Sequence, residues 1–95
     1  MRDKFFVVVS YDIRDERRLN KIAHIMTDYG HRVLYSVFEC YLEKDVFEKM
    51  KEKVEKEMDI EDSVIYYFLC ADCRRKIEHI GRDPFYLKEE ELSIV

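Results

Sequence analysis

The stretch Phe5-Phe6-Val7-Val8-Val9-Ser10-Tyr11-Asp12 decides how this chain folds. Its first five residues are all β-branched or aromatic, which is typical of a strand that is buried on both faces. Asp12 is the first charged residue after this run. The pattern therefore predicts a central strand that carries a carboxylate at its carboxyl end.

A helix is predicted to follow this strand, from about Asp15 to Tyr29. Apolar residues recur there every three or four positions and so share one face of a helix. Asp12 or Asp15 can cap the start of the helix, because a side-chain carboxylate accepts hydrogen bonds from the first free backbone N–H groups. Gly30 is expected to end the helix in the left-handed conformation.

The next 50 residues of the chain continue to alternate between extended and helical patterns. Residues 32–42 are rich in β-formers and predict two short strands or one bulged strand, with the break near Ser36. Asp45 and Glu48 have the spacing of a capping box and are expected to open a second helix that ends near Glu57.

Two further strands are expected after the second helix. Residues 63–70 are apolar and aromatic and predict another strand of the sheet. Residues 76–81 place Ile77 and Ile80 between polar residues and predict a short edge strand. Pro84 marks the start of a polar tail.

The element order predicts an α+β fold of the ferredoxin-like type, βαββαβ, with an antiparallel sheet and both helices on one face. A single domain is expected over residues 1–82, followed by an acidic C-terminal tail over residues 83–95. The other face of the sheet would be left uncovered with apolar side chains, so a homodimer is expected to cover it.

The composition is that of an ordinary globular domain of 95 residues, 40% charged and 47% hydrophobic. No apolar run approaches the length of a membrane span and no leader pattern is present, so a cytoplasmic protein without membrane contact is expected. The formal net charge of −4 argues only weakly against nucleic acid. The acidic residues concentrate in residues 43–62 and in the tail, which leaves room for a basic face.

The candidate site combines Asp12 with basic residues on the helix that follows. A carboxylate beside guanidinium groups suits phosphodiester chemistry, because the carboxylate holds a hard divalent cation and the basic groups hold phosphate. The basic residues are Arg14, Arg17, Arg18 and Lys21. The alternative is that Asp12 caps the helix and the basic residues pair with nearby acids. One carboxylate is a poor metal site, and two copies brought together at a dimer axis would be a better one.

Cys70 and Cys73 form a Cys-x-x-Cys motif. A structural zinc needs four ligands, and the third cysteine, Cys40, lies in a predicted strand. A redox pair normally opens a helix after a strand, whereas Arg74-Arg75-Lys76 follow here. Structural thiols are therefore the favoured interpretation, with a metal shared between subunits and a redox pair as the alternatives.

Several motifs resemble those of the second core family of CRISPR-associated proteins, the small protein of the adaptation stage. The matching stretches are Tyr11-Asp12-Ile13, Tyr29-Gly30, Arg32-Val33 and Tyr35-Ser36-Val37-Phe38-Glu39-Cys40. One departure is Leu34, which stands where the family often has Gln.

The resemblance implies a homodimer in which the edge strand 76–81 of each copy extends the sheet of its partner. It further implies an Mg²⁺-dependent (or Mn²⁺-dependent) nuclease that acts on single-stranded RNA, on duplex DNA, or on both. It also implies that the protein bridges dimers of the CRISPR integrase and supports the protospacer duplex. Asp12 would be the metal-binding and catalytic carboxylate. Arg17, Arg18 and Arg32 would contact nucleic acid, and Tyr11, Ser36 and Phe38 would support the site.

Three alternatives stay open beside the nuclease. The first is a non-catalytic scaffold of the integration complex. The second is a toxin-type messenger RNA interferase, which shares the fold and the early aspartate. The third is a ligand-sensing ferredoxin-like module, which a chain of this size disfavours because it leaves little room for an enclosed pocket.

Overall fold

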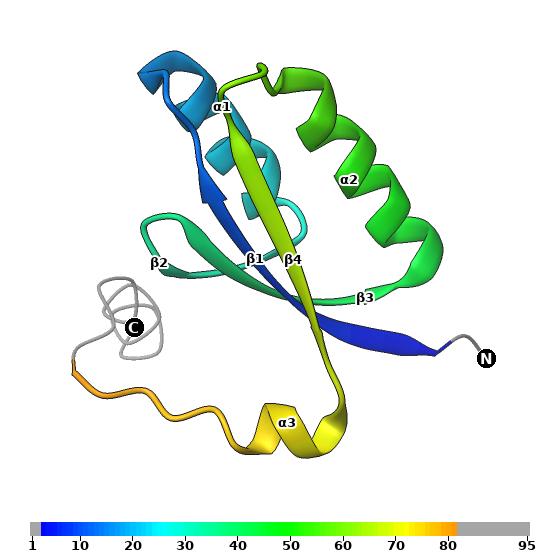
Figure 1. Ribbon diagram of the computed structural model, residues 1–95. Coiled ribbons are helices and arrows are strands. Elements are labelled where there is room, and N and C mark those ends of the chain that lie inside the picture. Colours follow the sequence, from blue (N-terminus) through cyan, green and yellow to red (C-terminus); the bar gives the residue numbers. More distant parts are fainter. Residues whose placement is uncertain (1–2, 82–95) are drawn as a thin grey trace, which may run out of the picture.

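Four antiparallel strands form one sheet in the order β2-β3-β1-β4 in the computed structural model, which describes residues 3–81 (Figure 1). The strands are β1 (Lys4–Asp12), β2 (Gly30–Leu34), β3 (Val37–Glu43) and β4 (Ser63–Leu69). The helices are α1 (Glu16–Thr27), α2 (Lys44–Glu57) and the short α3 (Ala71–Arg75). The expected ferredoxin-like fold is confirmed, with the buried run 5–12 as a central strand.

Both long helices cover the same face of the sheet. Val7 and Val9 of β1 alternate inward and join Ile22 of α1 and Met50 of α2 in one buried cluster, in which all four are 0% exposed. Phe38 of β3 lies in the same cluster. Because strand side chains alternate between faces, the intervening residues of β1 lie on the face without helices. This second face is called the open face below.

Local signals placed most element boundaries correctly. Asp15 caps α1, and its carboxylate accepts a hydrogen bond from the Arg18 N–H at 3.0 Å. The expected break near Ser36 is the turn between β2 and β3. The expected capping box of α2 is wrong: Glu43 is the N-cap and makes no side-chain capping bond. Asp45 instead accepts a hydrogen bond from the adjacent Val46 N–H.

Gly30 has a different role from the one expected. Among the described residues, Gly81 alone has a positive φ, so Gly30 does not end α1 in the left-handed conformation. Gly30 opens β2 against β3, where an added Cβ would lie 2.4 Å from Cys40 Sγ and 2.6 Å from the Glu39 carbonyl oxygen. Glycine is needed there because the two strands approach closely.

The expected edge strand over residues 76–81 is absent from the part of the chain that the structure describes. Instead, Cys70 caps a helical turn, α3, which the sequence analysis did not predict. Residues 77–80 then run beside the open face of β2 and β3, where Ile77 and Ile80 line a hollow with Leu34 and Val37. A strand forms only where a neighbouring strand pairs with its backbone, and residues 76–81 have no such neighbour within the described chain.

The acidic tail, residues 83–95, lies outside the described residues. Within residues 3–81, no helix is long and apolar enough to cross a membrane.

Candidate functional site

Asp12 lies at the carboxyl end of β1, between β3 and β4, as the sequence predicts. Its register partner on β4 is Ser63. The side chain is 70% exposed, and its Oδ2 lies 3.4 Å from Nη1 of Arg14. Because Tyr11 points into the core, Asp12 is on the open face. The position gives an accessible oxygen ligand on a strand that the rest of the sheet holds rigid.

Tyr11 fixes this end of β1 against the turn between β2 and β3. Its backbone N–H donates to the carbonyl oxygen of Ser36 at 3.0 Å, and its hydroxyl donates to the carbonyl oxygen of Tyr35 at 3.3 Å. Its ring stacks on Phe38 with the centroids 6.3 Å apart. Tyr11, Ser36 and Phe38 therefore support the position of Asp12 from inside the fold, and Ser36 does so through its backbone.

Arg32 lies beside this pair of aromatic rings. Its guanidinium carbon is 5.4 Å from the centre of the Phe38 ring. Burial raises the pKa of Tyr11, and a hydrogen bond with Arg32 offsets part of that rise. The side chain of Arg32 is half-buried and so lies within the support of the β1 terminus, apart from the exposed basic residues of α1.

Arg18 is held by three carboxylates in the loop that precedes β4. Its Nε lies 2.8 Å from Asp62 Oδ2, its Nη2 lies 3.1 Å from Glu61 Oε1, and its Nη1 lies 3.7 Å from Asp59 Oδ2. Asp62 also accepts hydrogen bonds from the backbone N–H groups of Arg14 at 2.9 Å and Asp59 at 2.8 Å. Arg18 therefore ties the start of α1 to the start of β4.

Asp62 is a structural partner of Arg18 that the sequence analysis missed. Its side chain is 0% exposed, although it lies in an acidic loop that resembles a solvated turn. The Arg18 hydrogen bond holds the pKa of Asp62 far below its usual range, and the two backbone N–H donors act in the same direction. The partners lie 44 residues apart in the chain, and no sequence spacing links them.

Replacing Asp62 by asparagine is expected to flatten the acid limb of the stability profile. A carboxylate with a depressed folded pKa contributes stability above its unfolded pKa of about 3.9, and this contribution is lost as the pH falls towards the folded pKa. The wild-type protein should therefore lose thermal stability faster than Asp62→Asn between about pH 5 and pH 2. Melting temperatures across this range measure the effect.

Glu52→Gln is the control for this profile, because Glu52 is an exposed carboxylate on α2. Parallel profiles for wild type and Asp62→Asn would show that the Arg18–Asp62 pair contributes nothing to stability.

The basic residues predicted to bind phosphate differ in the partners they meet in the fold. Arg18 and Lys21 share a face of α1 that points towards acidic residues of the neighbouring elements, whereas Arg14 precedes the helix, which begins at Glu16 after its N-cap Asp15. Lys21 Nζ lies 3.2 Å from Glu57 Oε1 on α2. Arg17 lies outside this face, is exposed, and has no ion pair within residues 3–81. Among Arg14, Arg17, Arg18 and Lys21, Arg17 is the one most available to an external phosphate.

A complete metal centre is not present within one copy of the described chain. Residues 3–81 contain no group of three His, Cys, Asp or Glu side chains placed to hold a metal ion. Asp12 supplies one hard carboxylate ligand. Mg²⁺ suits such a site, because it is usually bound by one or two carboxylates together with substrate phosphates and water.

Comparison with known proteins identifies the family. The family model described as CRISPR associated protein Cas2 matches residues 5–77. A protein named CRISPR-associated endoribonuclease Cas2 from Nitratidesulfovibrio vulgaris is 43% identical over 98 residues, which cover 97% of this chain and 96% of that one.

Two crystal structures share the fold over most of their length. One, of a hypothetical protein from Thermus thermophilus, has a TM-score of 0.76 at 32% identity and covers 86% of this chain and 96% of that chain. The other, of Streptococcus pyogenes Cas2 at pH 6.5, has a TM-score of 0.72 at 34% identity and covers 80% of this chain and 99% of that chain. The chain, with its exposed aspartate at the end of a central strand, therefore belongs to the Cas2 family of CRISPR-associated proteins.

Proposed function

We propose that this protein is a metal-dependent endonuclease of CRISPR adaptation, with Asp12 as the metal-binding and catalytic carboxylate. The observation that carries the proposal is the placement of Asp12, which is exposed at the carboxyl end of a central strand. The name of the Nitratidesulfovibrio vulgaris relative supports a phosphodiester substrate in RNA. Cleavage of RNA and of DNA by wild type and Asp12 variants tests the proposal.

The residues around Asp12 suit Mg²⁺ or Mn²⁺. A bound divalent cation would lower the pKa of a water ligand and polarise the phosphate. Asp12 would hold the cation, and Arg14, 3.4 Å away, would face the phosphate side of the same site. Tyr11 would keep the strand terminus in place through its hydrogen bonds to the β2–β3 turn.

A homodimer would complete this site. Leu34, Ile65 and Tyr67 occupy the open face, and each is between 47% and 52% exposed. Asp12 belongs to the same face, so two copies that bury these apolar side chains against each other could bring two Asp12 carboxylates together. Two carboxylates would give a cation the second protein ligand that one copy lacks.

The second candidate function is a scaffold that joins dimers of the CRISPR integrase and supports duplex DNA without cutting it. The observation that favours it is the lack of a three-ligand metal group within residues 3–81. A scaffold needs only the dimer, exposed cations and a surface for the integrase. The two functions differ in one measurable property, which is cleavage that depends on Asp12.

Binding of duplex DNA is expected to depend on Arg17 more than on any other residue of the first helix. Arg17→Ala should weaken binding for every sequence and reduce the slope of log affinity against log salt by about 0.9, the value for one lost phosphate contact. Fluorescence anisotropy at several salt concentrations measures both quantities.

Lys49→Ala is the matched control, because Lys49 is an exposed cation on α2, beside acidic side chains. It should leave the salt slope unchanged. Equal losses in the Arg17 and Lys49 variants would place the nucleic acid elsewhere. Arg18→Ala is less informative for binding, since it also breaks the contacts to Asp62 and Glu61.

A further inference from the structure

Two exposed cysteines lie at the junction between β4 and α3. Cys70 is the N-cap of α3 and Cys73 lies within the helix, and both are free thiols at the surface. The sequence analysis disfavoured a redox pair because no helix was expected after this strand. The structure supplies that helix, so the argument against a redox pair no longer holds.

The helical turn brings the two thiols together. The backbone N–H of Cys73 donates to Cys70 Sγ at 3.4 Å. The backbone N–H of Arg74 donates to the Cys70 carbonyl oxygen at 2.9 Å, which closes the turn. Residues three apart on a helical turn are neighbours, at a spacing that a disulfide can span with a small adjustment.

The two thiols differ in character. Hydrogen bonds from the Cys73 backbone and side chain lower the pKa of Cys70, whereas the same side-chain contact and the charge of Cys70 raise the pKa of Cys73. Cys40 is a contrast within the same chain, because burial raises its pKa to about 11. Near neutral pH, Cys70 is therefore the thiol with the largest thiolate fraction of the three.

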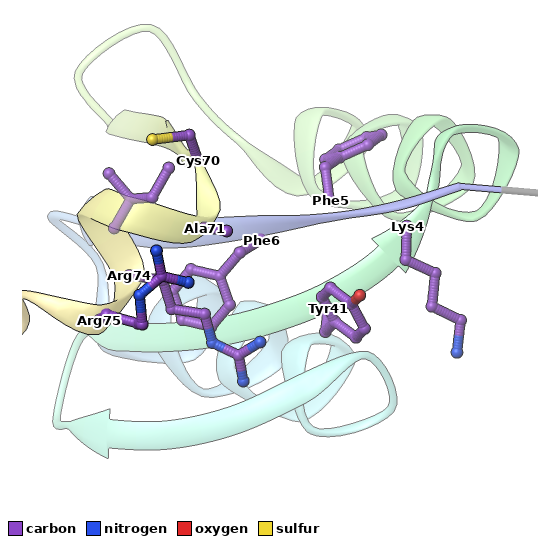
Figure 2. A pocket seen from close by; sticks show the side chains of 9 residues that line it. Lys4, Phe5, Phe6, Tyr41, Cys70, Ala71, Arg74 and Arg75 are labelled. Carbon is purple, nitrogen blue, oxygen red and sulfur yellow. The ribbon is translucent and has the colours of Figure 1, made fainter.

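The surroundings of Cys70 carry positive charge. A cavity of about 480 Å³ beside it is lined by Lys4, Arg74 and Arg75 together with apolar and aromatic side chains, and no acidic residue lines it. Figure 2 shows Cys70 at the start of α3, at the edge of this cavity. The guanidinium of Arg74 lies 4.5 Å from the centre of the Phe6 ring, which holds α3 against the open face. Asp72 forms an ion pair with Arg75, so Lys4 and Arg74 are the cations available to an anionic ligand.

We propose that Cys70 and Cys73 form a redox-active dithiol that exchanges with an anionic low-molecular-weight disulfide of the glutathione type. Cys70 is the attacking thiol and Cys73 is the resolving thiol. The carboxylates of such a disulfide would be attracted to Lys4 and Arg74. The product is a disulfide within α3, at the point where residues 76–81 leave the sheet.

The exchange is balanced in two steps. The Cys70 thiolate attacks one sulfur of the small disulfide, forms a mixed disulfide, and releases one small thiolate. The Cys73 thiolate then attacks Cys70 Sγ, closes the Cys70–Cys73 bond and releases the second small thiolate. The protein loses two electrons and two protons, and the small disulfide takes up both as it becomes two thiols.

Incubation of the full chain with oxidised glutathione tests the proposal. Intact mass spectrometry should show the wild type losing the mass of two hydrogen atoms, with Cys40 still open to alkylation after unfolding. Cys73→Ser should stop at a stable mixed disulfide on Cys70. Cys70→Ser should form its adduct on Cys73 more slowly than Cys73→Ser forms the adduct on Cys70, by about threefold or more.

Cys40→Ser is the control and should behave as the wild type does in this exchange. Circular dichroism establishes that all three serine variants fold, which is expected for Cys70→Ser and Cys73→Ser because both positions are exposed and is checked for Cys40→Ser because Cys40 is buried. Equal adduct rates in the Cys70 and Cys73 variants would overturn the assignment of roles. Disulfides between chains, in place of the bond within one chain, would overturn the proposal as a whole.

Discussion

Asp12→Ala is expected to reduce metal-dependent cleavage of RNA or DNA by about 100-fold or more. A bound divalent cation is worth several kcal/mol of transition-state stabilisation, and each ~1.4 kcal/mol lost lowers the rate tenfold. The variant should fold as the wild type does, because the Asp12 side chain is 70% exposed and its ion pair with Arg14 lies at the surface. It should also bind duplex DNA as well as the wild type or slightly better, since a negative charge near phosphate is removed.

The assay needs three comparisons. Asp12→Asn keeps the size of the side chain and removes the charge, and it should lose as much activity as Asp12→Ala. Glu52→Ala removes an exposed acid from α2 and should cleave as the wild type does. The wild type should cleave in the presence of Mg²⁺ and should not cleave when EDTA removes the metal. Sedimentation of each variant monitors the proposed dimer.

Two results would change the interpretation of Asp12. Normal cleavage by Asp12→Ala would assign the activity to another group or to a contaminant, and the scaffold function would then be preferred. Loss of the dimer or a large fall in the melting temperature would make Asp12 a structural residue. Neither result would affect the exchange proposed for Cys70 and Cys73, which lie at the opposite end of β4 from the partner of Asp12.

Phe38→Ala is expected to destabilise the fold by about 3–5 kcal/mol, the usual cost of removing a buried aromatic ring. Phe38 is 0% exposed, stacks on Tyr11 and lies under the guanidinium of Arg32. A domain of 95 residues has a total stability of roughly 5–14 kcal/mol, so much of it would be lost. Urea denaturation measures the change in the free energy of unfolding.

Further variants distinguish a Phe38 that holds the site in place from a Phe38 that takes part in the chemistry. Phe38→Leu keeps most of the buried volume and should retain more stability than Phe38→Ala, together with cleavage activity. Ile60→Ala is the control for an exposed apolar residue, at 99% exposure, and should change stability little. A folded Phe38→Ala variant of normal stability that cannot cleave would instead place Phe38 in direct contact with the substrate.

The positions of strands and helices follow largely from the sequence because they depend on short-range periodicity. Residues 5–12 form the central strand, the apolar stripe of the first helix packs in the core, and the break near Ser36 separates β2 from β3. The position of Asp12 at the end of β1 was also predictable from the sequence, because the prediction requires only that the end of a buried run be recognised. The capping box expected at Asp45 failed because the backbone at Glu43 already begins α2.

The contacts between distant parts of the chain were decided by tertiary structure. The 3.6-residue period places Arg14, Arg18 and Lys21 on one face, but it does not say what that face meets. In the fold it meets Asp62 and Glu57, because packing of α1 beside α2 and the start of β4 brings these acids within reach.

The role of Gly30 and the formation of α3 were likewise decided by tertiary structure. A glycine after a helix predicts a left-handed end, yet the close approach of Cys40 decides its role, and that approach exists only once β2 pairs with β3. The strand predicted over residues 63–70 is observed, but β4 is an edge of the sheet and its pairing ends at Leu69. The backbone beyond Leu69 therefore satisfies its hydrogen bonds within a helical turn, and this turn places Cys70 beside Cys73. The sequence by itself determined the four strands of the sheet, the two long helices and the strand-end carboxylate. Only the folded chain decided which charges are paired, because those contacts require distant segments to be brought together, and where β4 ends so that α3 can form.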